Sequence, residues 1–157
     1  MAKASINKEI RARGGDILES REFKAAMKQK HHLRASVGMH SIRVTQTSLR
    51  IANVLEKFGL EPDRQSLVTA GLCHDLGMLG RGSKFATTSE QNRQHPLDSA
   101  DSARKLRPDM DDKTKESIER HMFPLTPRPP RSLEGVILNI ADKYVSVKDL
   151  IMGRHPR

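Results

Sequence analysis

Apolar and small side chains recur every three or four residues along most of the chain, which is the spacing of one face of an α-helix. The longest such run predicts a helix from Val37 to Phe58, and Gly59 is expected to end it. A second helix is predicted from Pro62 to about Leu76, because proline favours the first helical turn. The alternation typical of a strand is not evident, so the pattern favours an all-α fold.

The same spacing predicts further helices on both sides of this pair. Pro96 is expected in a first turn, which puts His95 at or just before a helix start. Residues 80–94 are rich in glycine and polar side chains and predict a mobile loop. Prolines between 123 and 131 predict an extended strap. The other predicted helices cover residues 16–29, 96–106, 110–122 and 132–152.

These elements predict one all-α domain. Residues 1–34 are interpreted as an N-terminal helical extension and residues 35–157 as the helical core of the same domain, because no composition shift separates them. A length of 157 residues, with 36% hydrophobic and 30% charged residues, suffices for a real core in a soluble protein. The N-terminus lacks the apolar stretch of a secretory signal, and Cys73 is the only cysteine, so a cytoplasmic location is expected.

The charge balance favours anionic partners. Lysine and arginine exceed aspartate and glutamate by 28 to 19, which gives a formal net charge of +9. Aromatic residues make up only 3% of the chain, and this disfavours a surface that stacks single-stranded nucleic acid. No apolar run reaches the ~20 residues of a membrane span, so a membrane partner is not expected. A small anionic molecule is the favoured partner, and the pattern says nothing about oligomeric state.

Histidine and aspartate occupy inward positions on several of the predicted helices. Burying each without a partner costs on the order of 1–3 kcal/mol, whereas shared metal ions satisfy all of them. Imidazole and carboxylate ligands suit iron, manganese, cobalt, nickel or zinc better than magnesium or calcium. Six ligands exceed the needs of one tetrahedral ion and suit two adjacent ions bridged by a carboxylate. The candidate ligands are His40, His74, Asp75, His95, His121 and Asp142.

These residues resemble a known family. His40, the His74–Asp75 pair in "HDLG" and Asp142 in "IADKYVS" are similar to the motif of the HD-domain superfamily of metal-dependent phosphohydrolases. "HDLG" is similar to the HDIG variant of that motif. His95 in "RQHPLDSA" and His121 in "IERHMFPLTP" resemble the extra pair of members with dinuclear sites. The resemblance covers about residues 35–152, and it extends to small single-domain bacterial HDIG proteins.

The resemblance implies a helical bundle around one or two divalent transition metal ions, with iron or manganese favoured over nickel, cobalt or zinc. It implies that His40, His74 and Asp142 hold a first ion, and that Asp75 bridges to a second ion completed by His95 and His121. The implied activity is hydrolysis of a nucleotide or another small phosphate monoester or diester by a metal-bridged hydroxide. Asp75 and Lys143 are then the predicted catalytic residues.

Cations flank these segments and predict where a phosphate binds. Arg81 and Lys84 follow the His74–Asp75 pair, Arg93 precedes His95, and Arg128 lies on the proline strap. We expect these four residues to contact an anionic substrate, and Arg81 and Lys84 are favoured because a flexible loop can close over a phosphate.

Two other readings stay open. Some HD-fold enzymes use a similar ligand set as a mixed-valent di-iron oxygenase, and others are non-catalytic binding or signalling modules. The intact ligand set argues against the second alternative. Histidines 31, 32 and 155 are predicted to be dispensable for metal content, although His31 and His32 precede the first long helix and could contact a ligand from there.

Overall fold

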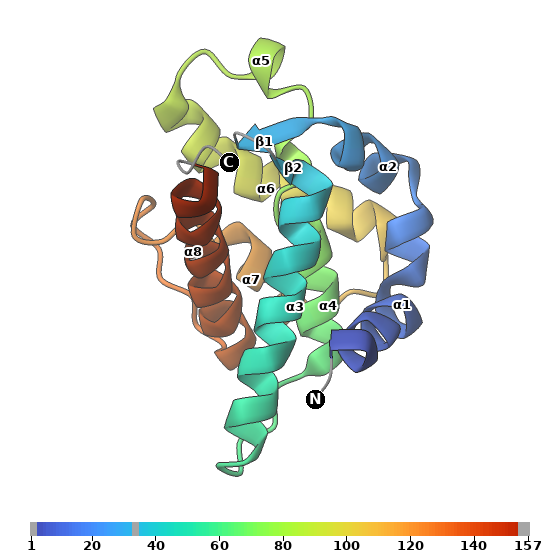
Figure 1. The fold of residues 1–157 in the computed structure, drawn as a ribbon. Helices are drawn as coiled ribbons and strands as arrows, with labels where there is room; N and C mark the ends of the chain where they lie inside the picture. The colour runs from blue at the N-terminus through green and yellow to red at the C-terminus, as the bar shows by residue number, and fades with distance from the viewer. Residues whose placement is uncertain (1–2, 33–34, 154–157) are drawn as a thin grey trace.

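A computed structural model describes residues 3–32 and 35–153 of the chain. Helices account for nearly all of its regular structure, as the sequence predicts (Figure 1). The elements in chain order are α1 (Lys3–Glu19), α2 (Arg21–Lys28), β1 (Lys30–His32), β2 (Ala35–Ser36), α3 (Val37–Glu56), α4 (Arg64–Cys73), the 3₁₀ turn η1 (Leu76–Met78), α5 (Arg81–Lys84), α6 (Thr88–Leu106), α7 (Asp112–Glu119) and α8 (Leu133–Gly153).

Side-chain caps explain where several helices begin. Each capping oxygen accepts the backbone N–H three residues further on, which satisfies one of the donors that a helix start leaves unpaired. The capping residues are Ser20 for α2, Ser36 for α3, Asp63 for α4, Thr87 for α6 and Asp111 for α7. Ser132, the predicted cap of α8, likewise accepts from Gly135 N at 3.0 Å.

The hydrophobic core lies between α3, α4 and α8 and extends to the N-terminal helices. Ile6, Ile17 and Phe23 of α1 and α2 are buried in the same cluster as Leu67 and Leu72 of α4. Cys73 is also fully buried there, as expected for a core residue. Residues 3–32 therefore contribute apolar contacts to the core that carries the other helices. In the described part of the chain, no helix combines the length and apolar character that crossing a bilayer requires.

The N-terminal part differs from the sequence prediction in two ways. One helix was expected over residues 16–29, but α1 and α2 form there, because Ser20 ends one helix and caps the next. The link before α3 is a short antiparallel hairpin of β1 and β2, where no strand was predicted. Strands this short contain too few residues for a period-2 pattern to show in the sequence.

The start of α6 is also different. His95 was predicted at a helix start, but it lies well inside α6, which begins at Thr88 and keeps Pro96 in its interior. The helix begins early because Thr87 accepts from Glu90 N at 3.1 Å while Glu90 accepts from Ala86 N at 2.9 Å. Together with α5, this early start replaces much of the loop predicted over residues 80–94.

Candidate metal centre

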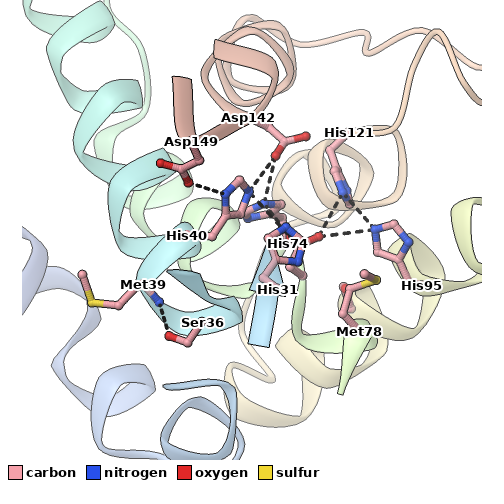
Figure 2. Close-up of polar contacts among 12 residues, drawn as sticks. His31, Ser36, Met39, His40, His74, Met78, His95, His121, Asp142 and Asp149 are labelled. Carbon is pink, nitrogen blue, oxygen red and sulfur yellow. Dashed lines mark hydrogen bonds and ion pairs between the residues drawn. The ribbon is translucent and has the colours of Figure 1, made fainter. Parts of the chain in front are cut away.

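The residues predicted as metal ligands come from five separate segments and meet at one place between the helices. Helix α3 carries His40, α6 carries His95 and α8 carries Asp142. Helix α4 ends at Cys73, so His74 and Asp75 occupy the turn before η1, and His121 occupies the turn after α7. Figure 2 shows the imidazoles of His40, His74, His95 and His121 pointing toward one another. All six side chains are buried, and His40 and His74 are fully inaccessible.

Asp75 divides this centre into two halves. Its Oδ1 lies 3.3 Å from His95 Nε2 and 3.5 Å from His121 Nε2. Its Oδ2 lies 3.4 Å from His74 Nε2 and 3.7 Å from His40 Nε2. The two carboxylate oxygens therefore face different imidazoles.

Asp142 completes the half that contains His40 and His74. Its Oδ1 lies 2.9 Å from His40 Nε2 and 3.5 Å from His74 Nε2. Two nitrogen or oxygen ligands that each lie about 2.0–2.1 Å from one metal ion are about 2.9–3.4 Å apart at right to tetrahedral angles. The separations in both halves are close to this range, so the donor atoms are already spaced as ligands of shared ions.

The other ring nitrogen of three histidines fixes their orientation. Nδ1 donates to a backbone carbonyl in His74 (Gly71 O, 2.8 Å), His95 (Gln91 O, 2.8 Å) and His121 (Ile118 O, 2.7 Å). In a neutral imidazole this leaves Nε2 as the unprotonated nitrogen, with its lone pair directed into the centre. His95 Nε2 and His121 Nε2 lie 3.2 Å apart, so when both rings are neutral in this tautomer their two lone pairs face each other. A bound cation removes that repulsion, so the residues fit a metal ion.

Comparison with protein families agrees with this geometry. The model of the HD domain matches residues 37–146, which include all six candidate ligands. The chain belongs to the HD domain family. Searches of curated proteins and of solved structures found no match. The match confirms the resemblance to the HD-domain superfamily, whose members are generally metal-dependent hydrolases that bind divalent metals, whereas the HDIG subdivision and the identity of the metal stay predictions.

The electrostatics of this HD domain favour charged carboxylates in its centre. Burial acts to raise the pKa of Asp75, but the imidazoles of His74, His121 and His95 outweigh it and hold the pKa well below the usual 3.8. Burial acts in the same sense on Asp142, and His40 and His74 hold its pKa well below the usual value. Burial alone lowers the pKa of His40, but the surrounding carboxylates of Asp142, Asp149 and Asp75 raise it to about 10.

Asp149 supports the HD-domain centre from outside. Its Oδ2 lies 3.9 Å from His40 Nδ1, on the side of the ring opposite to Asp142, and its Oδ1 accepts from Arg43 Nη1 at 2.8 Å (Figure 2). Asp149 was not among the predicted site residues. The signal that would have found it is its spacing of seven residues from Asp142, which places both carboxylates on one face of α8.

Lys143, one of the two predicted catalytic residues, lies at the edge of the centre. Its Nζ donates to the carbonyl of His121 and lies 3.5 Å from Asp142 Oδ2, and its side chain is 36% exposed. Asn139 Nδ2 also donates to the His121 carbonyl, at 2.9 Å. Lys143 therefore supports two of the candidate ligands, and its side chain is partly accessible to solvent.

The four predicted substrate-binding cations separate into two groups. Lys84 Nζ lies 2.6 Å from Asp98 Oδ2 and 3.2 Å from the carbonyl of Gly77, two residues after Asp75. Arg81 Nη2 donates to the carbonyls of Lys30 and His31 at 3.1 and 2.9 Å. These two residues thus lie next to segments of the centre.

Arg93 and Arg128 are exposed. Arg93 Nε contacts the Ser89 carbonyl of its own helix at 3.4 Å, and Arg128 lies in the irregular segment before α8. The assignment of all four cations to substrate binding stays a prediction.

The remaining histidines, His31, His32 and His155, were predicted to be dispensable for metal content. The structure places His31 of β1 inside the centre, because His31 is buried and its Nε2 lies 3.5 Å from Asp75 Oδ2. The side chain of His32 is not among those described, and His155 lies outside the described residues. Burial raises the pKa of the Cys73 thiol to about 12, so this cysteine is a packing residue and not a nucleophile.

Proposed function

We propose that this HD domain is a metal-dependent phosphohydrolase that acts on a nucleotide or another small phosphate ester. The proposal rests on the surroundings of Asp75, whose two carboxylate oxygens face different imidazole nitrogens at 3.3–3.7 Å. When bound there, divalent metal ions supply Lewis-acid activation of a water molecule and of a phosphoryl oxygen.

The protein's own residues fix the geometry that this chemistry needs. Asp75 and Asp142 concentrate negative charge where cations bind, and the carbonyl-bonded imidazoles hold their Nε2 atoms toward the same points. Preorganised donors of this kind cost no reorganisation during reaction. The near-complete burial of the six side chains keeps bulk water away from all but the edge of the centre.

Lysines at that edge favour an anionic substrate. Lys143 is partly exposed beside Asp142, and its ammonium group can reach an oxygen of a phosphate that approaches from solvent. Lys84 is 39% exposed and paired with Asp98, so an incoming phosphate competes with that carboxylate. The formal net charge of +9 adds a long-range attraction for anions.

The proposal is tested with protein purified without oxygen and analysed for metal content. The protein, loaded with Mn²⁺ or Fe²⁺, is offered nucleoside mono-, di- and triphosphates, dinucleoside polyphosphates and cyclic nucleotides, and release of phosphate or nucleoside is measured. Asp75→Asn keeps the size of the side chain and is expected to lose bound metal and turnover together. Asp101→Asn, at an exposed position of α6, is the matched control and is expected to keep both. Full turnover by Asp75→Asn would contradict the proposal.

The oxygenase alternative uses the same kind of donor set, so the same preparation also tests it. Oxygen consumption by the iron-loaded protein is followed while it is offered the same compounds. Oxygen uptake without phosphate release would show that the protein is an oxygenase and not a hydrolase. Neither reaction at any metal loading would favour the non-catalytic alternative.

A further inference from the structure

We propose that His31 is an additional metal ligand, supplied by the N-terminal hairpin to the half of the centre that contains His40, His74 and Asp142. The family match begins at residue 37, so this residue lies outside the part of the chain that the HD domain accounts for. The inference concerns metal binding alone and goes beyond the proposed reaction.

The ring of His31 is positioned like those of the neighbouring candidate ligands. His31 Nε2 lies 3.5 Å from Asp75 Oδ2, the same oxygen that faces His74 Nε2 at 3.4 Å and His40 Nε2 at 3.7 Å. Three imidazole nitrogens therefore approach one carboxylate oxygen. Donor atoms of His31, His40 and Asp75 all lie within 4.8 Å of one another, and the three residues are buried. In Figure 2 His31 lies among the other imidazoles of the centre.

The hairpin that carries His31 is attached by side-chain hydrogen bonds. Just before β1, Gln29 donates through Nε2 to the Met78 carbonyl at 2.6 Å and accepts through Oε1 from Gly80 N at 2.8 Å. Arg81 then donates to the carbonyls of both Lys30 and His31. The backbone of His31 is thus fixed to the segment that directly follows Asp75, which holds the imidazole at a set distance from the centre.

The number of donors in this half also fits a further ligand. His40, His74, Asp75 and Asp142 supply four donors to this half, and His31 makes five, which suits an ion of five or six ligands such as Mn²⁺ or Fe²⁺. The other half has His95, His121 and one oxygen of Asp75. The proposal therefore makes the two halves unequal, with the more completely ligated ion on the side of His31.

A pair of substitutions of nearly equal shape tests the assignment. In full-length protein, His31→Gln supplies only a neutral amide, whereas His31→Glu supplies a carboxylate that ligates metals. Binding of Mn²⁺ is measured by calorimetric titration of the metal-free protein, and the ligand field of the Co²⁺-loaded protein by visible absorption. Lys30→Gln, exposed on the same strand, is the control, and thermal unfolding of each metal-free variant checks that it folds.

If His31 is a ligand, His31→Gln weakens one of the two binding events by about 10-fold or more and alters the Co²⁺ spectrum, while His31→Glu binds within a few-fold of the unchanged protein. If His31 only contacts Asp75 structurally, the order reverses, because a second buried carboxylate beside Asp75 costs more than an amide. That reversed order, or unchanged affinity and spectrum in His31→Gln, would overturn the proposal.

Discussion

Asp149 illustrates how a single carboxylate can act on a metal centre without entering it. A metal-ligating histidine is usually held by a partner on its second ring nitrogen, and Asp149 Oδ2 stands 3.9 Å from Nδ1 of His40. The side chain is only 12% exposed, so its charge is poorly screened by water. Arg43 pairs with its other oxygen and keeps the carboxylate turned toward the ring.

We expect Asp149→Asn to weaken metal binding by about 10–100-fold, because the amide loses the charge that orients and polarises His40. The measurement is Mn²⁺ affinity by calorimetric titration. Arg43→Gln serves as the control, since it removes the outer partner and leaves the carboxylate in place, and its effect should be smaller. Equal affinity in Asp149→Asn and the unchanged protein would contradict the assigned role.

The sequence identified the six clustered donors because each occupies an inward position of a helical pattern or lies at a helix end, where an unpaired polar group is conspicuous. His31 was not predicted as a metal ligand because it lies on a strand of three residues, which is too short to show periodicity. Asp149 was not predicted because its spacing from Asp142 shows only that both lie on one face of α8, whereas its contact with His40 depends on how α3 and α8 pack. Contacts of that kind depend on packing between elements, which no single segment encodes.

At the level of elements, Gly77 determines how closely α6 approaches the His74–Asp75 turn. A Cβ atom at this position would lie 2.1 Å from the carbonyl oxygen of His95 and 2.8 Å from Ser99 N. Gly77 N also donates to Ser99 Oγ at 2.8 Å. The structure shows that this glycine is needed for close backbone packing. A positive φ of 72° occurs three residues later, at Gly80.

We expect Gly77→Ala to lower the free energy of unfolding by about 1–3 kcal/mol, because a backbone atom of α6 has to move. The same shift moves His95, so metal affinity should fall as well. Urea denaturation and metal titration measure the two effects. Gly82→Ala, where an added Cβ meets nothing within 4 Å, should change neither. Unaltered stability in Gly77→Ala would show that the approach of α6 is not tight.

A second contact between elements joins α1 to α4. Glu9 accepts from Arg64 through both oxygens at 2.7 Å and from Arg13 at 2.9 Å. The hydrogen bonds from Arg64, opposed by burial and aided by Arg13, lower the pKa of Glu9 below the usual 4.5. Because the folded state has the lower pKa, this stabilisation is complete above pH 4.5 and is lost as the pH falls through the lowered value.

Glu9→Gln should therefore cost about 1–2 kcal/mol of stability at pH 7, and the difference from the unchanged protein should shrink below pH 4.5. Chemical denaturation at pH 7 and at pH 3.5 or below provides the comparison. Glu22→Gln, at an exposed position of α2, is expected to leave stability unchanged at both values. A pH-independent loss in Glu9→Gln would show that charge is not the source of the effect.

Across the whole molecule, the centre joins segments that are far apart in the sequence. Its donors belong to α3, the α4–η1 turn, α6, the turn after α7 and α8, so a bound ion connects most of the bundle. A ligand that binds only the folded state stabilises it by mass action, by about 2.7 kcal/mol at a free concentration one hundred times its Kd. Metal binding and folding are thereby linked.

Removing the metal with a chelator should lower the Tm by about 5–10 °C for a chain of this size. Thermal unfolding followed by circular dichroism, with and without chelator, measures the shift. In Asp75→Asn the chelator should have little effect, because that variant holds no metal to remove. An identical Tm for the loaded and chelated protein would mean that the ions do not link these segments.

The predictability of the fold also depends on scale. The all-α class followed from helical spacing, since a periodic pattern over twenty residues leaves little choice of element. The start of α6 did not follow from that spacing. Pro96 suggested a boundary there, but the capping contacts of Thr87 and Glu90 begin the helix earlier. The sequence "TTSE" carries that capping signal, but the prediction did not use it and assigned these residues to a loop.

Main-chain oxygens at positions 71, 91 and 118 aim three of the imidazoles, and every amino acid carries such an oxygen. Replacing Gln91 or Ile118 leaves that acceptor in place as long as the helix keeps its path. Gly71 is more restricted, because an added Cβ would lie 2.4 Å from Thr45 Oγ1. Over generations, sequence drift around the centre is therefore restrained by the course of the backbone more than by the identity of these supporting side chains.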